Sequence, residues 1–141
     1  MSFCPPRFGT PRDPSRKTLG PACDKMTRAV WGSGLFPWQR HVVDVALELE
    51  PKPDGGYAMA YSVVVVVVPR RAGKSRLTLA TALYRASKPG SFIWYTAQDG
   101  KNAAEKFRLE MVPTLRNSPL SPLFKCRTSQ GSERVTVDGG G

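Results

Sequence analysis

The sequence has few of the features that define several common classes of protein. Its 141 residues include only three cysteines, Cys4, Cys23 and Cys126. They are scattered and never spaced as C-x-x-C, so neither a disulfide framework nor a zinc site is indicated. The longest apolar stretch, AMAYSVVVVVV, is shorter than the ~20 residues that span a bilayer. The first residues lack the apolar segment of a secretory signal. We therefore expect a soluble, intracellular protein without a membrane segment.

Acidic residues are also scarce. The chain has 11 Asp and Glu against 21 Lys and Arg, which gives a formal net charge of +10 and an isoelectric point near 10.0. A balance this basic is typical of chains that meet phosphate groups. An ordinary solvated basic surface would give the same numbers, because net charge governs solubility and encounter rather than fold.

Glycine and proline, 13 of each, gather toward the two ends of the chain. Residues 1–33 are rich in Pro, Gly, Ser and Arg without sustained periodicity, and we expect a flexible, disordered basic arm there. Residues 34–125 carry the helix and strand patterns of one domain. Residues 126–141 contain only the start of a further strand.

The first periodic segment is FPWQRHVVDVALELE. Its apolar side chains fall at helical spacing and form one stripe: Trp38, Val42, Val45, Ala46 and Leu49. A proline at position 37 suits the first turn of a helix, and prolines at 51 and 53 end it. The pattern predicts an amphipathic helix that begins near residue 37 and ends before residue 51.

Two later apolar runs are β-branched or aromatic and do not alternate with polar residues. They are VVVVVV at 63–68 and SFIWYT at 91–96, and helical patterns follow them at 75–90 and 100–112. Strands that are buried on both faces and alternate with helices are typical of a parallel sheet. The sequence therefore predicts an α/β fold, in which a parallel sheet is flanked by helices.

The turn after the valine run reads VPRRAGKS, residues 68–75. Gly-Lys-Ser ends the phosphate-binding pattern G-x-x-x-x-G-K-[ST], although a valine stands where the first glycine is expected. Such a loop aims successive backbone N–H groups at phosphate oxygens, and a lysine and a hydroxyl complete it. The predicted contacts are the backbone of Arg71, Ala72 and Gly73, the Lys74 ammonium for the β- and γ-phosphates, and the Ser75 hydroxyl for Mg²⁺. The predicted fold is thus a P-loop NTPase-type sheet, incomplete because only its first β-α-β units are present.

Arg70 and Arg71 add two positive charges inside the loop. One of them could reach the γ-phosphate and stabilise charge in the transition state, as an arginine finger supplied in cis does. Plain contact with phosphate or solvent is the simpler interpretation. A basic turn between a strand and a helix, without any nucleotide, would also explain the segment.

Three segments in this order resemble the ATPase domain of bacteriophage terminase large subunits, the motors that pump DNA into viral capsids. They are PWQ at 37–39, PRRAGKS at 69–75 and YTAQDGKNAAEKF at 95–107, and the resemblance covers roughly residues 35–115. It implies ATP and Mg²⁺ as ligands, ATP hydrolysis that drives packaging of double-stranded viral DNA, and a place in the host cytoplasm. It also implies a portal protein and a small terminase subunit as partners, and a ring oligomer.

The resemblance also assigns roles to individual residues. The PWQ segment is similar to the Q motif of helicases, which implies that Gln39 hydrogen-bonds the adenine and that Trp38 packs nearby. Trp38 also lies on the apolar stripe, so a place in the core is an equal alternative. Terminase loops often carry arginine at the position of Arg70 and lack the first glycine. The resemblance therefore makes Arg70 the cis finger, acting beside Lys74 in catalysis.

The chain lacks other parts of that family's machinery. No apolar run followed by Asp-Glu occurs in it, so the strand that supplies a Mg²⁺-binding aspartate and a water-activating glutamate is missing, as is the nuclease domain. We expect a truncated or split product that binds ATP weakly and hydrolyses little of it. Two alternatives stay open. One is a fragment of another P-loop ATPase, such as a helicase, and the other is a non-enzymatic basic module that binds nucleic acid.

Overall fold

The computed structural model describes residues 6–139. Helices and short antiparallel strands make up the fold, so the α/β class holds at this coarse level. In chain order the elements are β1 (Lys17–Thr18), α1 (Gly20–Trp31), α2 (Pro37–Ala46), β2 (Glu48–Pro51), β3 (Tyr57–Met59), α3 (Lys74–Ala86), α4 (Gly100–Lys106), the π-helix η1 (Phe107–Met111), α5 (Val112–Arg116), the 3-10 turn η2 (Ser121–Leu123), β4 (Phe124–Arg127) and β5 (Arg134–Val137).

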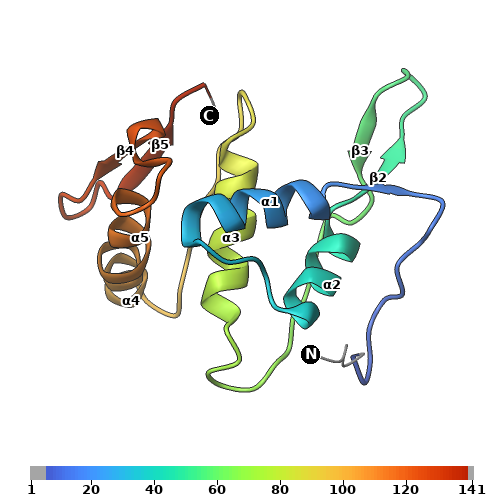
Figure 1. Cartoon of the computed structure of the whole chain (residues 1–141), viewed down its shortest axis with the longest axis horizontal. Helices are drawn as coiled ribbons and strands as arrows, with labels where there is room; N and C mark the ends of the chain where they lie inside the picture. Colours follow the sequence, from blue (N-terminus) through green and yellow to red (C-terminus); the bar gives the residue numbers. More distant parts are fainter. Residues whose placement is uncertain (1–5, 140–141) are drawn as a thin grey trace.

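Helix α3 lies at the centre of the fold, crossed by α1, with α2 on one side and α4, α5 and the β4–β5 hairpin on the other (Figure 1). Its buried face contributes to two clusters of side chains. The first joins it to α1 and α2: Cys23, Leu35, Val43, Leu47, Leu77, Ala80 and Tyr84. The second joins it to α1 and to the C-terminal helices: Val30, Leu79, Leu83, Met111 and Leu115. Because α3 belongs to both clusters, the helix is packed on two sides.

Residues 17–31, which the composition places in a disordered arm, form β1 and α1 instead. Cys23 and Thr27 of α1 are 0% and 1% exposed, and the helix ends at Gly32 in the left-handed conformation (φ 71°). The prediction of a disordered arm is therefore wrong for this part of the chain. Its Pro and Gly residues serve as a first-turn proline and a C-cap, which stabilise a helix rather than prevent one. Residues 1–5 of the predicted arm, with Cys4, lie outside the described residues.

The segment before β1 is held by a buried carboxylate at the start of β2. The Glu48 side chain is fully buried and pairs with Arg12 (Nη1–Oε1 2.9 Å) and Arg16 (Nη1–Oε2 3.3 Å). The backbone N–H of Asp13 donates to the same carboxylate at 2.9 Å. Burial raises the pKa of Glu48, but these hydrogen bonds outweigh burial and hold the pKa below its ordinary value. Glu48 therefore stays charged and fixes residues 12–16 to the fold.

Both sheets are small and antiparallel. The first has the order β1-β2-β3, with Lys17 opposite Leu49 and Glu50 opposite Ala58, and the second is the β4–β5 hairpin. The predicted helix at the PWQ segment forms as α2 but ends at Ala46, because the chain turns there into β2. The strand expected near the C-terminus forms as β5. The predicted domain boundary at residue 126 falls inside β4.

The two runs predicted as parallel strands are not paired with any strand of the described residues. Residues 63–68 and 91–96 have extended or irregular backbone. Val63, Val65 and Val67 are 78%, 80% and 90% exposed, and Trp94 is 81% exposed. The segment just before the first run does form a strand, β3 (Tyr57–Met59). The expected burial fails because neither run has a hydrogen-bonding neighbour or a covering layer on its outer face.

The predicted helix at 100–112 continues to Arg116 as α4, η1 and α5. Its middle turn is a π-helix, in which the Val112 N–H donates to the carbonyl of Phe107. Pro113 explains this change, since its ring would meet the carbonyl four residues before it in a regular α-helix. Among residues 6–139, every helix is too short or too polar to cross a membrane.

Candidate functional site

The predicted phosphate loop joins the valine run to α3. Arg71 (φ 61°) and Gly73 (φ 93°) both have left-handed backbone, and Arg71 is the only described residue other than glycine that does. Gly73 is the N-cap of α3, and no side chain caps the first turn of this helix. The N–H groups of the first turn are therefore left for an external acceptor, at the positive end of a 13-residue helix. Alternating left-handed residues also turn loop N–H groups toward one point, as in anion-binding nests.

Lys74 and Ser75 begin α3 with their side chains at this loop. The Lys74 ammonium donates to the carbonyl oxygens of Val68 (2.8 Å) and Pro69 (3.3 Å). It therefore lies across the loop, and its side chain is exposed. The Ser75 hydroxyl accepts a hydrogen bond from the Lys106 ammonium at 2.9 Å.

Arg70 and Arg71 are exposed, and Ala72 is half-buried. Among the described residues, no hydrogen bond or ion pair holds either guanidinium. Both charges are therefore available to a ligand at the loop. A left-handed conformation is uncommon for an arginine, and residues held in this way gather at functional sites.

Gln39 holds the loop from inside the protein. Its side chain is 0% exposed. Its Oε1 accepts from the Phe36 N–H (2.8 Å) and its Nε2 donates to the carbonyl of Gly73 (2.9 Å). The amide thus connects the start of α2 to the start of α3. Its predicted contact with adenine stays a prediction, and in this structure both ends of the amide hold backbone groups.

Trp38 lies beside Gln39 on α2 but is only half-buried. Its ring packs against the first core cluster, which contains Val43 and Leu47. This contact is the structural role that its place on the apolar stripe predicts. Its role beside adenine stays a prediction.

Arg76 also positions the loop, although no motif in the sequence indicates such a role. Its Nη2 donates to the carbonyls of Ser33 (2.5 Å) and Gly34 (3.0 Å). Its guanidinium carbon lies 5.9 Å and 5.8 Å from the ring centroids of Trp31 and Phe36. The residue therefore ties the first turn of α3 to the α1–α2 connection. Nothing in the local pattern after Gly-Lys-Ser indicates this contact, because the partners lie 40 or more residues earlier.

The donors at the loop fit a triphosphate with its magnesium ion. Uncapped N–H groups, the Lys74 ammonium and two unpaired guanidinium groups supply positive charge. Within residues 6–139, no group of three or more His, Cys, Asp or Glu side chains could hold a metal ion. A single hydroxyl such as that of Ser75, with the ligand's phosphates, is a typical set for Mg²⁺, which keeps much of its water.

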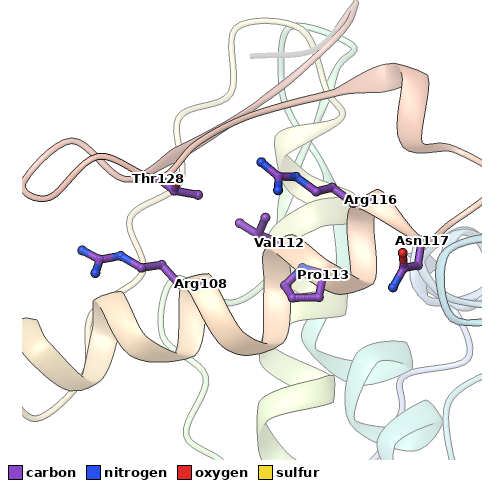
Figure 2. Close-up of a pocket in the computed structure, with 6 residues that line it drawn as sticks. All are labelled: Arg108, Val112, Pro113, Arg116, Asn117 and Thr128. Atoms are coloured by element: carbon purple, nitrogen blue, oxygen red, sulfur yellow. The ribbon is translucent and has the colours of Figure 1, made fainter.

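Two hollows of the described surface lie away from this loop. One, of about 440 Å³, is lined by Arg108, Val112, Pro113, Arg116, Asn117 and Thr128. Figure 2 shows Arg108 and Arg116 rising from the helix on either side of Thr128. The Arg108 guanidinium is paired with Glu133. A larger hollow, of about 1320 Å³, lies between residues 91–95, α4 and β5. No residue predicted to bind nucleotide lines either of them.

Comparisons of the chain with models of known protein families, with curated proteins and with solved structures found no match. The case for a function therefore depends on the geometry of the loop and on the sequence segments that surround it.

Proposed function

We propose that the chain binds ATP with Mg²⁺ at residues 69–75. The observation that carries this proposal is the loop itself, in which Arg71 and Gly73 have left-handed backbone before an uncapped helix. Lys74 and Ser75 occupy the first two positions of that helix. Backbone N–H groups, an ammonium and a hydroxyl thereby gather within a few residues, as phosphate binding requires.

Each loop residue has a distinct part in this proposal. The backbone of Arg71, Ala72 and Gly73 receives phosphate oxygens, and the Lys74 ammonium leaves the carbonyls of Val68 and Pro69 to meet the β- and γ-phosphates. The Ser75 hydroxyl serves as the protein's ligand to Mg²⁺. Arg70 lies before these residues, where its charge can meet the γ-phosphate as a cis finger.

We also propose that the two unpaired runs belong to a parallel P-loop sheet in the working protein. Their chemistry supports this, because both combine β-branched or aromatic side chains with unpaired backbone. In Figure 1 the chain runs downward in both extended runs and upward in α3, which connects them, as in a β-α-β unit. Parallel strands joined by a helix have this relation.

The wider role that we propose is the ATP-binding part of a DNA-packaging motor of the terminase large-subunit kind. Its support is the order and spacing of the three segments at 37–39, 69–75 and 95–107. Double-stranded DNA, a portal, a small terminase subunit and a ring of copies are the proposed partners, with the host cytoplasm as the place of action. Within residues 6–139, no carboxylate contacts Lys74 or Ser75, so we propose nucleotide binding with little hydrolysis.

Binding of a fluorescent ATP analogue to the purified chain tests the proposal, with Lys74→Ala as the site variant. Lys52→Ala is the matched control, since it removes one exposed lysine from the β2–β3 turn, on the opposite side of the molecule from the loop (Figure 1). We expect Mg²⁺-dependent binding that Lys74→Ala weakens at least tenfold and Lys52→Ala leaves unchanged. Circular dichroism should show both variants folded, because neither side chain is buried.

The same preparations distinguish a nucleic-acid module from a nucleotide site. A module would bind duplex DNA with an affinity that falls steeply with salt and is the same in wild type and Lys74→Ala. That result, together with no measurable binding of the ATP analogue, would contradict the proposed function.

A further inference from the structure

The side chain of Lys106 reaches the phosphate loop from the last residue of α4. Its ammonium donates to the Ser75 Oγ at 2.9 Å and lies 3.5 Å from the Glu110 carboxylate. No other side-chain hydrogen bond joins residues 100–116 to residues 68–76 within the described chain. The contact therefore links α4 to the hydroxyl that we assign to Mg²⁺.

An ammonium and a divalent cation compete for this hydroxyl. A serine oxygen offers two lone pairs, and Lys106 directs an N–H at one of them. A metal ion on the same oxygen would lie a few ångströms from the ammonium, and like charges at that distance repel strongly where solvent is partly excluded. Lys106 must therefore leave Ser75 when a metal ion binds there.

Glu110 gives the ammonium a place to go. It lies one turn after Lys106 on the same continuous helix, and the two groups already form an exposed ion pair at 3.5 Å. A shift of the side chain toward Glu110 requires no new partner. The contact with Ser75 also matters to α4, because none of the residues Gly100–Lys106 is buried.

We propose that the Lys106 ammonium occupies the Ser75 hydroxyl when no nucleotide is bound, and that Mg²⁺ with its nucleotide displaces it from Ser75 and releases α4. The inference rests on the proposed nucleotide function. It gives that function a regulatory element, since occupancy of the loop is sensed by a helix 25 residues further along the chain, from Ser75 to Gly100.

The metal requirement of nucleotide binding tests this competition. Binding of the fluorescent ATP analogue is titrated with Mg²⁺ for wild type, Lys106→Gln and Lys101→Gln. Lys101 is the matched control, as it is an exposed lysine of the same helix without a contact to the loop. We expect Lys106→Gln to reach half-maximal binding at about three- to tenfold lower Mg²⁺, as expected for loss of one partly exposed charged hydrogen bond. Lys101→Gln should match wild type.

Binding without metal separates this role from direct contact with phosphate. In EDTA, Lys106→Gln should bind the analogue within twofold of wild type. A large loss there would show that Lys106 is a phosphate ligand and overturn the inference. An unchanged Mg²⁺ requirement would overturn it too, with the proposed function left intact. Failure of wild type to bind the analogue at any Mg²⁺ concentration would overturn the proposed function and this inference with it.

Amide hydrogen exchange supplies a readout that needs no binding constant. In the nucleotide-free chain, amides of residues 100–106 should exchange at least threefold faster in Lys106→Gln than in Lys101→Gln or wild type. Mg²⁺ with the ATP analogue should bring wild type to the rates of Lys106→Gln. Equal rates in all three nucleotide-free proteins would overturn the proposed link between loop and helix.

Discussion

The side-chain amide of Gln39 donates to the carbonyl of Gly73 at 2.9 Å and joins two helices that begin 37 residues apart, at Pro37 and Lys74. The other end of the amide accepts from the Phe36 N–H. A buried amide satisfied on both sides is worth more than its two hydrogen bonds, because its removal leaves two partly buried backbone groups unpaired. Gln39 thus determines where the predicted phosphate loop lies relative to α2.

We expect Gln39→Ala to lower the free energy of unfolding by about 2–4 kcal/mol, through the unpaired groups and the cavity left behind. Gln98→Ala is the control, since Gln98 is exposed and its loss should cost less than about 0.5 kcal/mol. Urea denaturation of the three proteins measures both values. Equal urea midpoints for Gln39→Ala and wild type would contradict this structural role of Gln39.

Gly73→Ala should also destabilise the loop. Its φ of 93° is unfavourable for any residue with a Cβ, and the new atom would lie 2.9 Å from the Gln39 Nε2. We expect Gly73→Ala to lower the free energy of unfolding by about 1–3 kcal/mol. Gly100→Ala gives the matched comparison, because no atom lies within 4 Å of its added Cβ. That change should be neutral or slightly stabilising in the same urea experiment, as alanine favours helix over glycine.

The helix α2 shows what the sequence can and cannot predict. Its existence and its start at Pro37 follow from the pattern, but the buried residues are Gln39, Val43 and the C-cap Leu47 rather than the predicted stripe. Apolar periodicity could not select this face, because a glutamine occupies one of its three positions. The amide can be buried only because partners from Phe36 and Gly73, the latter distant in sequence, satisfy it.

The prediction of disorder for the N-terminal segment is wrong for a related reason. Composition alone gives residues 12–16 the character of a solvated basic arm, yet Arg12 and Arg16 both meet the buried Glu48. Nothing near either arginine in the sequence indicates a carboxylate more than 30 residues later. Long-range ion pairs of this kind depend on the tertiary fold, which a local pattern does not contain.

Stability should depend on this carboxylate below neutral pH. The pKa of Glu48 is held below its ordinary 4.5 by the Asp13 N–H, Arg12 and Arg16, in spite of burial. The contribution of Glu48 is therefore fully present above pH 4.5 and is lost as pH falls through the lower folded-state pKa. Asp24, whose pKa is also lowered, should add to the loss as pH falls below its ordinary 3.8.

Glu48→Gln tests that dependence. At pH 7 we expect a loss of about 2 kcal/mol, because two arginines lose their charged partner while remaining partly solvated. Between about pH 5 and pH 3, the free energy of unfolding of Glu48→Gln should fall less steeply with falling pH than that of wild type. Parallel slopes for the two proteins would show that other carboxylates govern acid unfolding.

The two unpaired runs mark where sequence and structure differ most. Their residue types predict buried strands. In the first run only the burial of one side chain agrees with this prediction, because Val66 packs against the first core cluster while its neighbours Val65 and Val67 are exposed. A strand needs neighbours for its backbone as well as apolar side chains, and residue types at 63–68 cannot say whether those neighbours exist. Substitutions in the run can test directly whether each valine side chain is buried or exposed.

Val67→Lys distinguishes the exposed run from a central strand. Because Val67 is 90% exposed, we expect its replacement to change the free energy of unfolding by less than about 0.5 kcal/mol. Val66→Ala, in the same run, should cost about 1 kcal/mol, since its side chain packs on the core. Urea denaturation at micromolar concentration measures both, with light scattering to verify that the proteins are monomeric. A loss above about 3 kcal/mol for Val67→Lys would mean that the side chain is buried, as it would be in a parallel sheet.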